Sequence, residues 1–427
     1  MKFLIKNGYL IEPKTGKEGK FDILIEDGVI KKIGKNISSK NYKVIDCKNK
    51  IVCPGFVDLH CHLREPGRED EETIYTGSLS AVSGGFTTIC CMPNTEPALD
   101  NKVSIRFVYE KGKEGFCEVL PIGAITKKRE GKELALYFEM IEENVVAFSD
   151  DGNCVMDSNL MRRALEYTLL HKKVVISHSE DKNLSKNGVM NEGFISTKLG
   201  LPGIPKEAEE IMVERDIKLA KLTGGLLHLA HLSTEGSVES VRREKNKLKN
   251  ITCEVTAHHI TLTEEAVIGY NPNAKVSPPL RTEKDRISLI EGLKDGTIDC
   301  IVTDHAPHSY EEKESGFENA PFGIIGFETF LPLCLKLIDY GIKLKDIIYK
   351  ITYAPSKIIN IERGIIEEGK KADIVVFDPD IEWIYTEDEI KSKSKNTPFL
   401  NWKLKGKVLL TISKGKIVYR DDKRFKD

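Results

Sequence analysis

The 427-residue sequence has little net charge and contains no glutamine. Its 64 Lys and Arg residues nearly balance its 66 Asp and Glu residues, which leaves a formal charge of −2. This balance gives no electrostatic reason to expect nucleic acid or an anionic membrane as a partner. The lack of glutamine beside many Lys and Glu residues is typical of thermophilic proteins, although biased codon usage produces the same pattern.

Long hydrophobic runs are missing as well. The first nine residues hold only a short apolar patch that Lys6 interrupts, so we expect neither a secretory signal nor a membrane span there. The ten cysteines form no C-x-x-C zinc ribbon and no small disulfide framework, and several lie within apolar runs (Cys53, Cys90, Cys91 and Cys300). We therefore expect buried, reduced thiols in a cytoplasmic protein.

Both ends of the chain are rich in short strand-like runs with tight turns. Near the N-terminus, runs at 3–5, 21–25 and 29–30 are separated by the turns Asn7-Gly8 and Asp27-Gly28, and similar runs occur at 373–377, 408–412 and 416–419. Each end alone is too small to hold a hydrophobic core. We therefore predict one discontinuous, β-sandwich-like domain built from residues 1–53 and 360–427.

The middle of the chain, residues 54–359, alternates strand-like and helical segments. Apolar, β-branched runs occur at 55–60, 85–91, 118–124, 145–149, 173–177, 226–231, 251–256 and 299–303, and helical periodicity occurs at 157–171, 206–222 and 283–294. About eight βα units in ~300 residues is the size of a TIM barrel, so we predict an α/β fold with a (β/α)8 barrel as the catalytic domain. A doubly wound sheet ranks second, because no Gly-rich dinucleotide loop follows the first strand.

Two histidines stand close together at the end of the first barrel strand, in the motif D-L-H-C-H-L-R at residues 58–64. His60 and His62 are two residues apart, and residues at that spacing in a strand face the same side. They are well placed to hold a divalent metal at the mouth of the barrel. The alternative is two surface histidines that have this spacing by chance.

Further metal-binding side chains stand at the ends of four other strand-like runs, namely Asp150 and Asp151, His178, His231 and Asp304. Active sites of TIM barrels lie at the C-terminal ends of the strands. Any one of these residues alone would more often be structural. Together, five strand ends with four His and at least two Asp describe a site large enough for two metals. The residues alone do not choose between Asp150 and Asp151.

The remaining histidines have plainer interpretations. His171 ends a predicted helix and is expected at the surface. His228 is expected to pack against a helix, on the face opposite His231, and His305 is expected to point away from Asp304. Either His258 or His259 could line the site.

The motif at residues 58–66, D-x-H-x-H-x-R-x-P, resembles the pattern of the dihydroorotases and their amidohydrolase relatives, and so does T-D-H-A-P-H at 303–308. The resemblance extends over nearly the whole chain, through segments 92–95, 148–152, 231–234, 278–281, 321–323 and 364–373. Hydantoinases, allantoinases and one class of dihydroorotase bridge two metals with a carbamylated lysine. This chain has F-S-D-D at residues 148–151 instead, which is similar to the class bridged by an aspartate, and the match implies Asp151.

The resemblance implies two zinc ions per subunit. One would be held by His60, His62 and Asp304, the other by His178 and His231, with Asp151 and a hydroxide or water bridging both. It further implies reversible cyclisation of N-carbamoyl-L-aspartate to (S)-dihydroorotate in pyrimidine biosynthesis, with Asp304 as the catalytic acid and base.

The resemblance also implies the residues that bind this substrate, which are Arg64, Asn94, Ser277, His308, Phe322 and Gly323. Arg64 can pair with the substrate carboxylate, and the alternative for it is a salt bridge with Glu65 or Asp70. Ser277 stands where this class usually has Asn and hydantoinases often have Ser. Residues 309–319 form either a mobile lid or a solvated loop.

The sequence leaves three competing functions open. The first is a hydantoinase or allantoinase, which Ser277 favours and the missing bridging lysine disfavours. The second is a catalytically silent scaffold for aspartate transcarbamoylase, and the third is a zinc deaminase or deacetylase. Relatives of this class can associate with aspartate transcarbamoylase, so that partner and a homo-oligomer are both compatible with the sequence.

Overall fold

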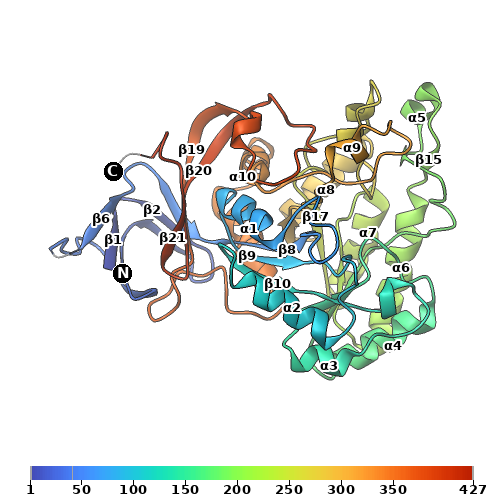
Figure 1. Ribbon diagram of the computed structural model, residues 1–427, viewed down its shortest axis with the longest axis horizontal. Coiled ribbons are helices and arrows are strands. Elements are labelled where there is room, and N and C mark those ends of the chain that lie inside the picture. Colours follow the sequence, from blue (N-terminus) through green and yellow to red (C-terminus); the bar gives the residue numbers. More distant parts are fainter. Residues whose placement is uncertain (1, 41, 426–427) are drawn as a thin grey trace.

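The computed structural model describes residues 2–40 and 42–425 of the chain (Figure 1). Figure 1 shows an α/β part on the right and a β-rich part on the left, next to both ends of the chain. The α/β part contains the residues predicted to bind metal and substrate. The β-rich part packs against it through the long strands β19 (Ile374–Ile384) and β20 (Lys403–Ser413).

All eight strand-like runs predicted in the middle of the chain form strands, and these strands pair in parallel. Two sheets result, with strand orders β10-β9-β8 and β11-β12-β13-β16-β17-β18. The strands are β8 (Phe56–Cys61), β9 (Phe86–Cys91), β10 (Glu118–Pro121), β11 (Gly123–Ala124), β12 (Ala147–Ser149), β13 (Val174–Ser177), β16 (Leu227–Leu229), β17 (Ile251–Thr256) and β18 (Cys300–Val302).

Backbone hydrogen bonds connect the edges of these two sheets. Where the chain passes from β10 to β11, the amide of Ile122 donates to the carbonyl of Cys91 over 3.0 Å. At the other edge, Asp304 N donates to His60 O over 2.9 Å and His62 N donates to His305 O over 2.8 Å. The end of β18 therefore lies beside the end of β8, and the residues that follow these two strands meet.

The predicted helices are present, and their ends follow local signals. The side chain of Asp157 caps the helix that begins at Ser158. A capping box of Thr282 and Asp285 starts the helix Glu283–Asp295, and Gly296, with φ of +83°, caps its C-terminal end. The helices are α1 (Ile74–Ser83), α2 (Lys102–Gly112), α3 (Tyr137–Glu142), α4 (Ser158–Leu169), α5 (Phe194–Leu199), α6 (Glu207–Thr223), α7 (Glu235–Lys245), α8 (Glu283–Asp295), α9 (Tyr310–Lys313), α10 (Phe330–Leu335), α11 (Leu344–Ile351) and α12 (Tyr353–Ile358).

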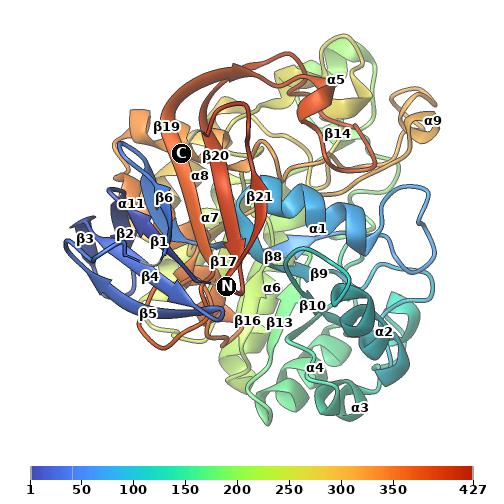
Figure 2. The ribbon, with the colours of Figure 1, turned by 60° about the vertical axis from the view of Figure 1, so that its left-hand side comes forward.

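The β-rich part combines strands from both ends of the chain, which lie side by side in Figure 2. One sheet has the order β21-β20-β19-β7-β2-β3 and the other the order β5-β4-β1-β6. Apolar side chains from both chain ends, such as Phe3, Ile25, Ile374 and Leu410, share one buried cluster. The strands not yet given are β1 (Lys2–Lys6), β2 (Tyr9–Glu12), β3 (Lys17–Lys20), β4 (Asp22–Glu26), β5 (Val29–Gly34), β6 (Lys43–Asp46), β7 (Ile51–Pro54) and β21 (Lys416–Arg420), and two short strands, β14 (Met190–Asn191) and β15 (Gly203–Ile204), pair elsewhere.

All ten cysteine side chains are buried, as the apolar runs around them predict. Burial raises the pKa of thiols such as those of Cys53 and Cys91 above the ordinary value. Within residues 2–40 and 42–425, no helix combines the length and the apolar character that a membrane crossing needs.

Candidate metal centre and active site

A cavity of about 790 Å³ opens at the carboxyl ends of the parallel strands. All six residues predicted to bind the substrate line it, together with four of the predicted metal ligands, His62, Asp151, His178 and Asp304. The six are Arg64, Asn94, Ser277, His308, Phe322 and Gly323. Loops far apart in the sequence therefore bring the predicted substrate and metal residues to one cavity.

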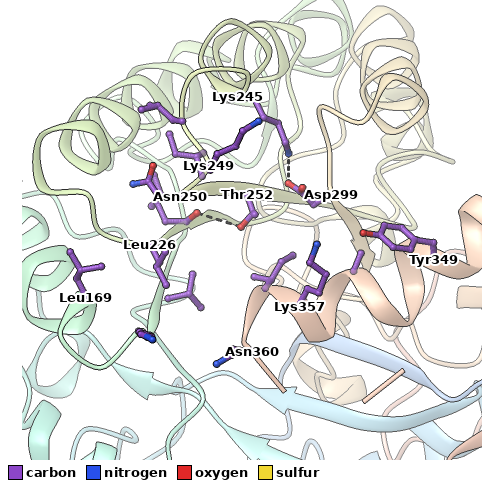
Figure 3. Close-up of a pocket in the computed structure, with 17 residues that line it drawn as sticks. Leu169, Leu226, Lys245, Lys249, Asn250, Thr252, Asp299, Tyr349, Lys357 and Asn360 are labelled. Atoms are coloured by element: carbon purple, nitrogen blue, oxygen red, sulfur yellow. Dashed lines mark hydrogen bonds and ion pairs between the residues drawn. The ribbon is translucent and has the colours of Figure 1, made fainter. Parts of the chain in front are cut away.

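A second cavity, of about 680 Å³, lies at the opposite ends of the strands (Figure 3). It is lined by Val174, Leu227 and Ile251, at or next to the amino ends of β13, β16 and β17. No histidine lines it, and its one carboxylate, Asp299, forms an ion pair with Lys245. Of these two cavities, only the first is lined by histidines among the described residues.

Asp151 lies between two pairs of histidines. Its Oδ2 is 3.3 Å from His60 Nε2 and 3.5 Å from His62 Nε2. Its Oδ1 is 3.1 Å from His178 Nδ1 and 3.3 Å from His231 Nε2. Each oxygen of one carboxylate thus faces a different pair, and two metal-binding groups share Asp151.

Asp304 completes the cluster next to the first pair. Its Oδ1 is 3.1 Å from His62 Nε2 and 3.6 Å from His60 Nε2. Asp304 and His231 have positive φ values of 48° and 30°, which non-glycine residues rarely adopt. Such backbone conformations concentrate at functional sites, where the surrounding structure holds them.

The neighbouring residue Asp150 has a different role in the structure. Its Oδ1 accepts hydrogen bonds from Ile125 N at 2.8 Å and Thr126 N at 3.0 Å, and its Oδ2 accepts from the hydroxyl of Thr126. These contacts join the end of β12 to the loop after β11. The structure thus places Asp151, rather than Asp150, among the histidines.

The charges of this buried cluster balance one another. Burial is the largest influence on the pKa of Asp151 and would raise it, but the charge of His60 and hydrogen bonds from His178 and His231 outweigh burial and hold that pKa well below its usual range. Burial likewise lowers the pKa of His178, but hydrogen bonds with Asp151 and Glu180 raise it to about 9. Without metal ions, protons therefore supply the positive charge that these carboxylates require.

Acceptors outside the cluster orient its histidines. Nδ1 of His60 lies 2.7 Å from Glu254 Oε1, which orients the ring so that Nε2 is directed at Asp151. In the same way, Asn94 Oδ1 lies 2.7 Å from His62 Nδ1, and Glu180 Oε2 lies 2.9 Å from His178 Nε2. Hydrogen bonds of this kind fix the tautomer of metal-binding histidines and raise their basicity.

Glu254 and Glu180 were not predicted from the sequence. Glu254 is fully buried within β17, whose other residues are Ile, Thr, Cys and Val. An acidic residue inside an apolar strand was a signal that could have found it, because a buried carboxylate needs partners. Glu180 follows His178 by two residues and carries no comparable signal.

The prediction for His228 was wrong. Instead of packing against a helix, its Nε2 lies 3.0 Å from Glu254 Oε2 and its Nδ1 lies 2.8 Å from Thr252 Oγ1. Both partners belong to the neighbouring strand β17. A buried imidazole needs hydrogen-bond partners, and polar side chains of β17 supply one at each nitrogen of His228.

His171 and His305 lie as expected, whereas neither His258 nor His259 lines the cavity of about 790 Å³. His171 is exposed, and His305 stacks on Phe327 with its Nε2 3.4 Å from Glu72, which turns it away from Asp304. Both ring nitrogens of His259 have partners. Its Nδ1 lies 2.7 Å from Thr256 Oγ1, and its Nε2 lies 2.9 Å from Pro278 O. His258 is buried, and its Nε2 has no hydrogen-bond partner among the described residues.

Arg64 is buried at the cavity, and its salt-bridge partner differs from both predicted alternatives. Its Nε is 3.0 Å from Glu71 Oε2 and also donates to Pro307 O over 3.0 Å. Its Nη2 lies 3.1 Å from His308 Nε2. The sequence pointed to Glu65 or Asp70, but the turn after β8 brings Glu71 to the guanidinium instead.

The segment 309–319 contains α9 and is anchored by a buried lysine. Nζ of Lys313 donates to Pro321 O over 2.8 Å and to Gly323 O over 2.9 Å. These bonds connect α9 to the residues that line the cavity. Movement of the segment as a lid stays a prediction.

Solved structures with the same fold belong to cyclic amide hydrolases. The L-hydantoinase (dihydropyrimidinase) of Arthrobacter aurescens has a TM-score of 0.87, with 23% identity over 98% of this chain and 96% of that one. The D-hydantoinase (dihydropyrimidinase) of a Thermus species has a TM-score of 0.83, with 23% identity over 98% and 95% of the two chains. At such identities the similarity establishes the fold alone.

The amino-acid sequence narrows the class further. Residues 49–237 match a family model described as dihydro-orotase-like. A dihydroorotase of Caldanaerobacter subterraneus subsp. tengcongensis is 50% identical over 100% of this chain and 99% of its own length, and one of Aquifex aeolicus is 49% identical over 99% and 100%. The chain belongs to the dihydroorotase family, and it is a hydrolase of a cyclic amide.

Proposed function

We propose that the protein catalyses the reversible, zinc-dependent cyclisation of N-carbamoyl-L-aspartate to (S)-dihydroorotate with loss of water, a step of de novo pyrimidine biosynthesis. The observation that carries the proposal is the position of Asp151 between two histidine pairs, in a cavity that Arg64 also lines. A metal-binding cluster suits the amide chemistry, and a buried guanidinium suits the substrate carboxylate.

We further propose that the parallel strands close into a (β/α)8 barrel formed by residues 54–359. The hydrogen bonds between the ends of β18 and β8, and between Ile122 and Cys91, support closure. Residues 1–53 and 360–427 would form the accessory β-sandwich-like domain, which the six-stranded sheet with strands from both chain ends supports.

The donor set fits two zinc ions. His60 Nε2 is buried and makes no regular hydrogen bond among the described residues, which is expected of a nitrogen directed at a metal. His60, His62 and Asp304 would hold one ion, His178 and His231 would hold the other, and Asp151 would bridge them. When bound, zinc supplies Lewis acidity towards a carbonyl and lowers the pKa of water.

Asp304 would move the proton in the reaction. Burial would raise its pKa, but the charge of His60 and a hydrogen bond with His62 outweigh burial and lower it, so the carboxylate is ionised at neutral pH. In the cyclising direction it takes a proton from the ureido nitrogen that closes the ring. In the hydrolytic direction it returns that proton to the departing ring nitrogen.

The other cavity residues would bind and orient the substrate. All six line one cavity, in which Arg64, Asn94 and His308 would surround the carboxylate while Ser277, Phe322 and Gly323 would contact the ring. Gly323 has φ of +137°, and a Cβ there would lie 2.7 Å from the Cβ of Ala306. Only glycine therefore allows the chain to pass this close to the pocket.

A hydantoinase or allantoinase is the second candidate, favoured by Ser277 at the cavity. The deciding experiment measures turnover of dihydroorotate, hydantoin and allantoin by the purified, zinc-loaded protein before and after chelation. We expect dihydroorotate turnover that chelation abolishes. Turnover of hydantoin or allantoin alone would refute the proposed substrate. No turnover at full zinc occupancy would favour a scaffold, and the oligomeric state and an association with aspartate transcarbamoylase stay predictions.

A further inference from the structure

Glu71 lies in the loop between β8 and α1 and contacts two of the residues proposed to bind the substrate. Its side chain is buried, with Oε2 3.0 Å from Arg64 Nε and Oε1 2.8 Å from His308 Nδ1. Among the described residues, no other carboxylate oxygen lies within 4.0 Å of a guanidinium nitrogen of Arg64. One buried carboxylate therefore neutralises Arg64 and contacts His308 at the same time.

The contacts of Glu71 determine which atoms of Arg64 remain for a ligand. Nε faces Glu71 and Pro307 O, and Nη2 faces His308, which orients the plane of the guanidinium. Nη1 makes no hydrogen bond with another described residue. Because Arg64 lines the cavity, Nη1 and the second hydrogen of Nη2 are the donors left for a carboxylate.

Glu71 also selects the tautomer of His308. A carboxylate can only accept, so the nearby Nδ1 of His308 must carry the proton. Burial and the charges of Arg64 and Lys313 hold the pKa of His308 well below its usual range, so the ring carries one proton only. Nε2 then accepts from Arg64 Nη2 at 3.1 Å and cannot donate to Phe322 O, which lies 2.9 Å away.

We propose that Glu71 is a positioning residue that holds Arg64 and His308 as one carboxylate-binding unit and thereby gives the enzyme its preference for ring substrates with a carboxylate. The inference rests on the proposed function. It assigns the role to a residue that touches neither the substrate nor the metal cluster. Arg68 and Glu312 extend the unit to α9, because Arg68 Nη2 is 2.7 Å from Glu312 Oε1 and 3.4 Å from Glu71 Oε1.

The test compares Glu71→Gln with Glu69→Gln in the zinc-loaded full chain. Gln keeps the shape of Glu71 but removes its charge, whereas Glu69 is exposed on the same loop and its side chain accepts only from Gly67 N at 2.9 Å. For Glu71→Gln we expect the KM for dihydroorotate to rise about 10- to 100-fold. The kcat should stay within about threefold of the parent value, because the metal cluster is untouched. Glu69→Gln should change neither.

Two further measurements separate positioning from a general structural effect. In Glu71→Gln, the inhibition constant of orotate, an unreactive ring with the same carboxylate, should rise in parallel with the KM. Glu71→Asp keeps the charge but has a shorter side chain, and it should raise the KM and the inhibition constant as well. In the parent protein, nitrogen NMR should find His308 as the Nδ1–H tautomer, whether or not the variants fold.

The outcomes distinguish this inference from the proposed function. If the parent protein does not turn over dihydroorotate, the proposed function fails. If it does, and Glu71→Gln leaves both the KM and the orotate constant unchanged, or lowers kcat alone, the positioning role is refuted. An Nε2–H tautomer of His308 would refute it as well.

Discussion

Replacement of Glu254 by Gln tests whether a residue that touches no metal controls the affinity of the cluster for zinc. Glu254 accepts from His60 Nδ1 at 2.7 Å and from His228 Nε2 at 3.0 Å, and it is fully buried. Loss of such an outer partner lowers metal affinity by about 10- to 100-fold, which corresponds to about 1.4–2.7 kcal/mol. Gln preserves the volume, so we expect the fold to persist. His228 can exchange tautomers, because the hydroxyl of Thr252 can donate or accept.

The assay is competition for zinc between the protein and a chelator of known affinity, at one fixed pH. Glu328→Gln is the matched control, because Glu328 is also buried but bonds to Ser80 Oγ and Lys391 N, both at 2.8 Å, away from the cluster. We expect weaker zinc binding in Glu254→Gln only. Equal affinity of Glu254→Gln and the parent protein would mean that the bond to His60 has no influence on the metal.

Four substitutions and a change of pH test the proposed site further. Asp304→Asn should lower kcat by about 10²- to 10⁴-fold, because the group that moves the proton is lost. Arg64→Lys should raise the KM for dihydroorotate about tenfold, since an ammonium cannot reproduce the paired geometry of a guanidinium; an unchanged KM would remove Arg64 from the substrate site. Zinc affinity, measured by calorimetry, should increase as the pH rises towards 9, because zinc must displace the proton of the metal-free His178, whose pKa is raised to about 9. Asp150→Asn should lower the free energy of unfolding by about 1–3 kcal/mol but leave bound zinc in place, whereas Asp151→Asn should lose zinc; metal analysis and thermal unfolding check the pair.

The alternation of apolar runs was enough to predict the parallel strands, because strands buried on both faces carry a strong local signal. The pairing of the chain ends was predicted from the small size of each end, but β2, β3, β6 and β7 were missed. Segments such as Lys17–Lys20 are short and largely exposed, so composition alone does not mark them as strands. Their position depends on pairing with distant partners, as β7 pairs with β19.

The site was predictable where chemistry coincided with strand ends. His60, His178 and Asp304 each stand in or just after a strand, and parallel strands bring such residues to one edge. Glu71 and Glu254 could not be assigned in the same way, because their partners lie far away along the chain. Glu71 meets His308 across 237 residues and Glu254 meets His60 across 194, so only the fold reveals these pairs.

Because every native thiol is buried, the folded protein offers no accessible thiol to maleimide or iodoacetamide reagents. A single cysteine introduced at an exposed position, for example at Glu311 in α9, would be the one fast-reacting site. A fluorophore or spin probe could be attached there without replacing any of the ten natural cysteines. Such a probe would report directly whether the segment over the cavity moves when a ligand binds.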